Sequence, residues 1–134
     1  MRSDNLNITF KMNTPTQIEY QLEAEYKRWE ILLSTLKNEN EFLMLQLSQV
    51  LDGKVDKQFI LKAEYFQNEF IAKDENIKDM INDIKAELRL IYNTKDKLPV
   101  KNLLKHEKLK NEIKYFERNF SSLKTEFGKS VSKG

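Results

Sequence analysis

His106 is the only histidine among the 134 residues, so it is the first candidate for proton-transfer chemistry. A histidine beside a carboxylate can accept and donate a proton near neutral pH. If the chain folds into antiparallel helices, His106 lies level with about Glu87 and Tyr20. The chain has no cysteine, and no serine stands within a nucleophile motif. We therefore interpret His106 as a packing residue near one end of a helical bundle rather than as a catalytic base.

Other residues that could hold ions or phosphate lack the spacing that such sites need. A di-iron bundle uses two Glu-x-x-His motifs, whereas the residue three before His106 is Leu103. An acidic helical face lacks the glycine and the terminal glutamate spacing of a calcium loop. Its residues are Asp74, Glu75, Asp79 and Asp83. Residues 128–130 lack the earlier glycine of a phosphate-binding loop. The sequence therefore predicts no metal, no cofactor and no enzymatic activity.

Lysines gather in the last third of the chain. Residues 95–134 contain eleven Lys and Arg against five Asp and Glu. At helical spacing Lys101, Lys105 and Lys108 share one face and could contact phosphates. Glutamates such as Glu107 and Glu112 interrupt this basic surface. A nucleic-acid-associated accessory role, with these three lysines as anion contacts, is therefore the alternative function and not the first one.

The elements that position these residues are three long amphipathic segments. Their apolar residues recur at alternating spacings of three and four, which is typical of helices packed side by side. Apolar residues make up 40% of the chain and charged residues 33%, with only three glycines and two prolines. The sequence predicts an all-α, elongated, antiparallel three-helix bundle that is coiled-coil-like. This layout is similar to that of spectrin-like three-helix bundles, a likeness that concerns architecture and not function.

Local signals predict where each helix begins and ends. Thr14 can cap the first helix, with Pro15 at its first position. Gly53 is expected to end that helix in the left-handed conformation, and Gly128 to end the third. We expect helices at about 15–52, 54–94 and 97–127 within one domain, residues 14–128. Residues 1–13 are expected to form a flexible arm, and residues 129–134 a disordered tail.

Two polar residues interrupt the apolar seam of the first helix, which otherwise includes Leu32. They are Glu25 and Asn40. Antiparallel register places Asn40 level with Gln67 or Asn68. A buried pair of amides commonly fixes helix register and oligomeric state at some cost in stability. We therefore predict that Asn40 sets the register of the bundle.

The Gly53 end of the predicted hairpin carries more apolar residues than one seam can absorb. The third helix is expected to end near Phe127, level with about Phe66, which would leave this end uncovered. A helix that is apolar on more than one face needs more than one partner. The sequence therefore predicts a homodimer interface at this end. Its residues are Phe42, Met44, Leu45, Leu51, Phe59, Ile60 and Leu61.

The function that this pattern favours is protein–protein interaction. No signal-peptide pattern precedes the helices, and no apolar run approaches the roughly 20 residues of a membrane span. We expect a non-enzymatic, cytoplasmic helical interaction or scaffold protein that acts as a homodimer through the Gly53 hairpin tip. The expected partners are a second copy and a further protein, and no membrane contact is expected.

Overall fold

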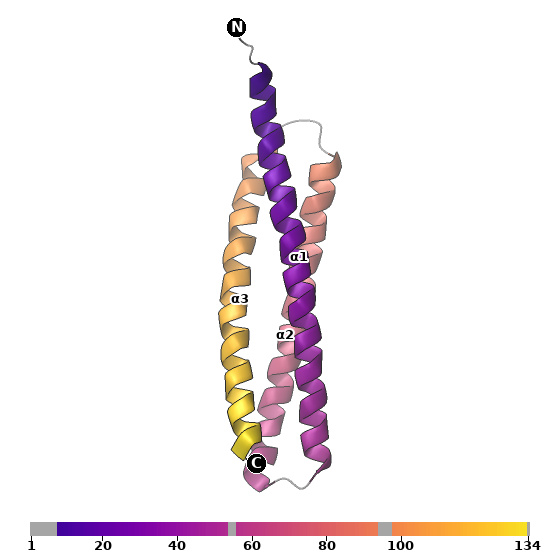
Figure 1. Cartoon of the computed structure of the whole chain (residues 1–134), viewed down its shortest axis with the longest axis vertical. Helices are drawn as coiled ribbons and strands as arrows, with labels where there is room; N and C mark the ends of the chain where they lie inside the picture. The colour runs from indigo at the N-terminus through magenta and orange to yellow at the C-terminus, as the bar shows by residue number, and fades with distance from the viewer. Residues whose placement is uncertain (1–7, 54–55, 94–97, 134) are drawn as a thin grey trace.

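The computed structural model describes residues 8–53, 56–93 and 98–133, which form three helices and no strand in those ranges (Figure 1). Helix α1 spans Ile8–Asp52, α2 spans Lys57–Asn93 and α3 spans Val100–Lys133. The predicted all-α, antiparallel three-helix bundle is confirmed.

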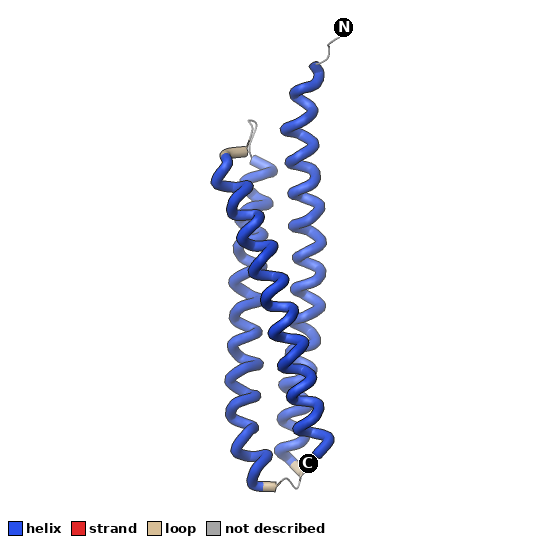
Figure 2. The backbone as a smooth tube through the Cα atoms, turned by 90° about the vertical axis from the view of Figure 1, so that its left-hand side faces the viewer, coloured by secondary structure: helices blue, strands red, loops and turns tan. Residues whose placement is uncertain are grey.

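The helices lie side by side as a rod. α1 and α2 form a hairpin and pack most closely, and α3 lies along this hairpin, parallel to α1 (Figures 1 and 2). Because the number of antiparallel helices is odd, the two ends of the chain lie at opposite ends of the rod (Figure 1). The first turns of α1 project beyond the neighbouring ends of α2 and α3.

A seven-residue repeat of buried side chains holds the helices together. In α1 the buried Tyr26, Leu33, Asn40 and Leu47 recur every seven residues, and α2 and α3 repeat the pattern. The equivalent buried residues of these two helices are Phe59, Phe66, Met80, Phe70, Ile77, Ile84, His106, Ile113, Phe120 and Phe127. Leu32 and Glu25, predicted for this seam, are only partly buried; their neighbours Leu33 and Tyr26 occupy the core instead.

α1 begins earlier than predicted. It starts at Ile8 and runs through Pro15, so part of the expected flexible arm is helical. A proline inside a helix removes one hydrogen bond, to the carbonyl four residues before it. Since this part of α1 projects beyond the other helices, water can bond that carbonyl. Residues 1–7 of the predicted arm lie outside the described residues.

The α1–α2 turn is closed by hydrogen bonds rather than by a left-handed glycine. The Gly53 amide donates to the carbonyl oxygen of Val50 at 3.2 Å, and Gly53 does not have a positive φ. A tightened last turn of this kind satisfies a terminal carbonyl without the left-handed conformation. On the far side, Asp56 Oδ1 accepts from the Phe59 amide at 2.7 Å, so Asp56 caps α2.

α3 differs from its prediction at both ends. It begins at Val100, just after Pro99, whereas the expected start at about residue 97 lies outside the described residues. It continues through Gly128 to Lys133, so the predicted stop and tail at 129–134 are wrong over residues 129–133. Glycine inside a helix costs only about 1 kcal/mol relative to alanine. Val131, one turn later, packs against the core and favours continuation.

Candidate functional site

The exposed apolar residues beside the α1–α2 turn form the largest unexplained feature of the rod. Five of the seven predicted interface residues are exposed, and we call them the tip surface. They are Phe42, Leu45, Leu51, Ile60 and Leu61. Leu61 is the most exposed, at 72%. All five lie within about 15 Å of the turn along the helix axes, from the 1.5 Å rise per residue.

Two predicted interface residues belong to the chain's own core. Phe59 is 4% exposed and is buried within the bundle, so it is not available to a partner. Met44 is partly buried and packs against the same core. The prediction was wrong for Phe59 because it lies at a core position of α2, one heptad before the buried Phe66. Sequence spacing alone does not tell which apolar residues of a crowded segment face inward.

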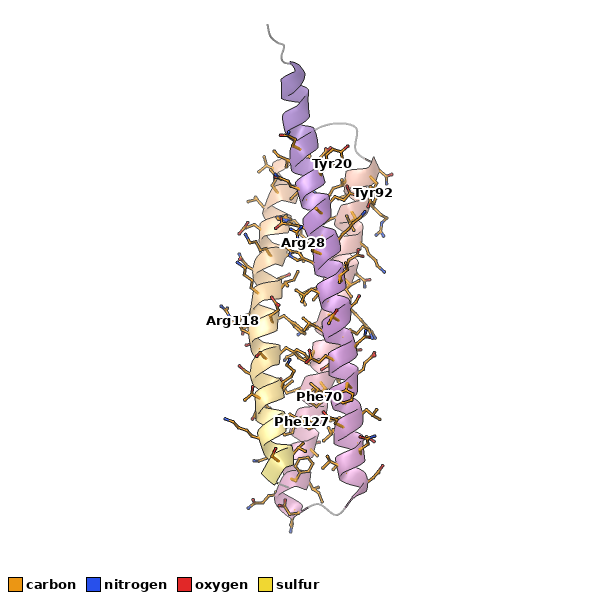
Figure 3. The ribbon with its side chains drawn as sticks, viewed as in Figure 1. Tyr20, Arg28, Phe70, Tyr92, Arg118 and Phe127 are labelled. Carbon is orange, nitrogen blue, oxygen red and sulfur yellow. The ribbon has the colours of Figure 1, made fainter. Side chains whose placement is uncertain are left out.

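An aromatic junction shows how far α3 covers this end. The Phe127 ring lies 5.1 Å from that of Phe66 and 5.2 Å from that of Phe70, both edge-on. Figure 3 shows Phe70 and Phe127 together between the helices. Further out, the Tyr65 hydroxyl donates to Glu126 Oε1 at 3.1 Å. The third helix therefore covers the inner side of the hairpin tip, and the tip surface lies on its outer side.

The register of α1 against α2 explains the layout of the tip surface. Lys37 Nζ lies 3.5 Å from Asp74 Oδ1 across the two helices. One and two heptads toward the turn, this pairing places Met44 beside Gln67 and Leu51 beside Ile60. A shallow depression of about 290 Å³ lies there, lined by Met44, Leu47, Ser48, Leu51, Asp52 and Gln67. Leu45 and Leu61 occupy the outermost heptad positions on either side of it.

Asn40 of α1 lies beside Phe70 of α2 and is fully buried, at 0% exposure. Its Nδ2 donates to the carbonyl oxygen of Phe70 at 2.8 Å, and its Oδ1 has no hydrogen-bond partner. The predicted amide partners are wrong, since Gln67 and Asn68 are exposed. Asn40 still joins α1 to α2, but through the backbone. The register-setting role of Asn40 stays a prediction.

A second polar cluster surrounds His106 near the Pro99 end. His106 is buried, and its ring stacks on Trp29 at 4.9 Å and meets Tyr26 edge-on at 5.2 Å. Its Nε2 lies 2.7 Å from Glu25 Oε1, but the two atoms are not aligned as a hydrogen bond. Tyr20, predicted to lie level with His106, is exposed and is not part of this cluster.

The remaining members of this cluster come from all three helices. Asn102 Nδ2 donates to Glu87 Oε1 at 3.0 Å, which joins α3 to α2. Burial raises the pKa of the Tyr26 hydroxyl, and the negative charges of Glu87 and Glu25 raise it further. The hydroxyl therefore stays protonated at neutral pH. Packed rings fill the space beside the imidazole, so the cluster fits a structural role better than proton transfer to a substrate.

The His106→Ala variant is expected to lower the free energy of unfolding by about 1–3 kcal/mol, because it removes a buried ring stacked on Trp29. Trp29 is the only tryptophan, so its emission should shift to longer wavelength as water reaches it. Urea denaturation followed by fluorescence measures both effects. Glu107→Ala, at the exposed neighbouring position, is the control. Equal stability of the two variants would mean that His106 contributes nothing to packing.

The three lysines predicted as anion contacts are only partly available. Lys101 is exposed. Lys105 Nζ lies 3.7 Å from Asp83, and Lys108 Nζ lies 4.0 Å from Glu112. Carboxylates therefore share the face that would meet a phosphate backbone.

A metal-binding cluster and a membrane-spanning helix are both absent from the described residues. Among their side chains no three His, Asp or Glu residues lie close enough to hold a metal ion. Over the same part of the chain, none of the helices combines the length and the apolar character needed to cross a bilayer. Sequence reasoning missed two features: the outer position of the tip surface and the backbone partner of Asn40. Only the heptad position of each residue could have indicated them. Comparison with protein-family models, curated proteins and solved structures finds no match for this chain.

Proposed function

We propose that this chain is a cytoplasmic, non-enzymatic helical interaction protein that associates with a second copy of itself through the tip surface. The observation that carries the proposal is the exposure of large aliphatic side chains on both helices beside one turn. Soluble monomers seldom leave apolar side chains gathered in this way. The tip surface is thus a candidate interface and not only a solvated end.

A second copy fits this surface for two reasons. Both helices of the hairpin contribute to it, so a two-fold axis can place two hairpins face to face as four helices. Its rim carries both signs of charge, from Asp52 and Asp56 and from Lys57 and Lys62. Two copies can therefore meet without like charges facing one another along the whole rim.

The expected affinity is moderate. An apolar surface of about 250 Å² per copy, and so about 500 Å² in the pair, contributes about 12 kcal/mol at about 25 cal/mol per Å². Lost translational and rotational freedom opposes association by about 4 kcal/mol or more. We therefore expect a dissociation constant in the micromolar range rather than an obligate dimer.

Sedimentation velocity over about 1–100 µM tests this proposal, since that range brackets a micromolar dimer. The wild-type chain should pass from monomer to dimer. The double variant Leu45→Lys, Leu61→Lys should remain monomeric, because it places two charges in the apolar interface. Both positions are exposed, so the fold should persist. A wild-type monomer throughout this range would contradict the proposal.

The matched control is the double variant Ile31→Lys, Leu104→Lys. These residues are 69% and 67% exposed, but they lie away from the tip surface. The control adds the same charge and removes the same kind of side chain, so it should dimerise like wild type. Equal loss of dimer in both double variants would show that charge, and not the tip surface, decides association.

The alternative function, nucleic-acid binding by α3, has less support. Lys105 and Lys108 each lie within 4.0 Å of a carboxylate, which reduces their attraction for phosphate. Among the described residues, no other feature favours nucleic-acid binding.

A further inference from the structure

A groove runs between α2 and α3 at the middle of the rod, away from the tip surface. Its volume is about 320 Å³, and we call it the α2–α3 groove. Buried Met80 and Phe116 form its apolar floor. Its rim carries Asp79 and Asp83 from α2, and Glu112 and Tyr115 from α3. Tyr115 is 62% exposed, so its ring is available to a partner at this rim.

The carboxylates around this groove are not fully paired with basic side chains. Lys73 also lines it, but its Nζ lies 3.2 Å from Oε1 of Glu69, one turn earlier on α2. Within the described residues, Asp79 has no basic group within 4.0 Å. Asp83 and Glu112 have lysine partners only at 3.7 and 4.0 Å. Exposed pairs at such distances contribute little and can exchange partners.

We propose that the α2–α3 groove binds a basic amphipathic helix of a partner protein. One apolar side chain of that helix packs on Met80 and Phe116, since the volume suits one or two side chains. Its lysines or arginines meet Asp79, Asp83 and Glu112. The Tyr115 ring packs against the stem or the charged head of one of them. Two adjacent helices already form the groove into which a third lays its apolar face.

This interface is separate from the proposed self-association. Met80 and Leu61 are 19 residues apart on α2, which corresponds to about 29 Å. Loss of dimerisation in the tip variants should therefore leave peptide binding unchanged. Failure of either proposal would not be mistaken for failure of the other.

The probe is a fluorescent 18-residue peptide of leucine and lysine arranged at heptad spacing, with a scrambled peptide of the same composition beside it. Binding to the full chain is followed by fluorescence anisotropy. Asp79→Lys should weaken binding of the heptad peptide by about tenfold or more, because it places a like charge in the groove. Glu75→Lys changes the net charge equally at an exposed position outside the groove, so it should change binding by about threefold or less.

A second pair of variants tests the groove from the other side. Lys105→Ala releases Asp83 from its lysine and should strengthen binding several-fold. Lys101→Ala removes the same charge from the same helix without freeing a groove carboxylate, and should have a smaller effect. Circular dichroism checks that each variant stays helical. Equal effects within each pair, or equal binding of the scrambled peptide, would show non-specific attraction and overturn the proposal.

Discussion

Phe70→Ala is expected to lower the free energy of unfolding by about 3–5 kcal/mol, the largest effect of any change considered. Phe70 is fully buried, and its ring lies 5.2 Å from that of Phe127 and 6.3 Å from that of Phe66. Its removal leaves a cavity where all three helices meet, since Asn40 of α1 bonds to the Phe70 carbonyl. Thermal unfolding should show a midpoint lowered by roughly 10–18 °C.

Tyr115→Ala is the control for this variant. It removes an aromatic ring from an exposed position, so the free energy of unfolding should change by about 0.5 kcal/mol or less. Measurement at low protein concentration keeps self-association from contributing. If Phe70→Ala were no more destabilising than Tyr115→Ala, the aromatic junction would not be the packed centre described here.

Asn40→Asp is expected to have the next largest effect, a loss of about 3 kcal/mol or more at neutral pH. The side chains have nearly the same shape, but the variant buries a charge and replaces the donor facing the Phe70 carbonyl with an acceptor. Burial raises the folded-state pKa of the new carboxyl above its unfolded value of about 3.9. The loss should therefore be absent below about pH 4 and should grow as the pH rises. Urea denaturation at several pH values measures it.

Asn40→Leu should have the opposite sign. It removes the buried Oδ1 that has no partner, so stability should be unchanged or higher. Without the Asn40 bond the helices can align in more than one way, and sedimentation should reveal mixed oligomers. Outright unfolding of this variant would mean that the amide has a structural role beyond register.

The architecture could be predicted because the apolar spacing repeats along each helix, so many residues independently indicate the same helical bundle. The helix ends could not, because each depends on a few residues. Pro15 and Gly128 are strong local signals, yet the helices continue through both. A proline or a glycine inside a helix costs about 1–3 kcal/mol. Hydration of the freed carbonyl, or packing of the following turn, can offset that cost.

The candidate sites were predicted in part for the same reason. The exposed leucines of the tip followed from crowding of apolar residues, whereas the inward position of Phe59 depended on the heptad phase of α2 in the packed bundle. Asn40 was expected to pair with another amide, but its partner is a backbone carbonyl, which every residue supplies. His106 was predicted to lie level with Glu87, and this is correct to within about one helical turn. Asn102, which lies one turn before His106, bonds to Glu87. The α1 partner of His106, Glu25, could be identified only from the packing itself.

The opposite placement of Ile8 and Lys133 along the rod gives the bundle the geometry of a spacer. These two residues are held apart by at least the length of α3, about 50 Å for its 34 residues. The tip surface lies at the end where α3 finishes (Figure 1). Two copies joined there, each with an α1 of about 67 Å and with tips that overlap by about 15 Å, would form a rod roughly 120 Å long with both amino-terminal ends pointing outward. Such a rod would set a fixed distance between two identical attachments.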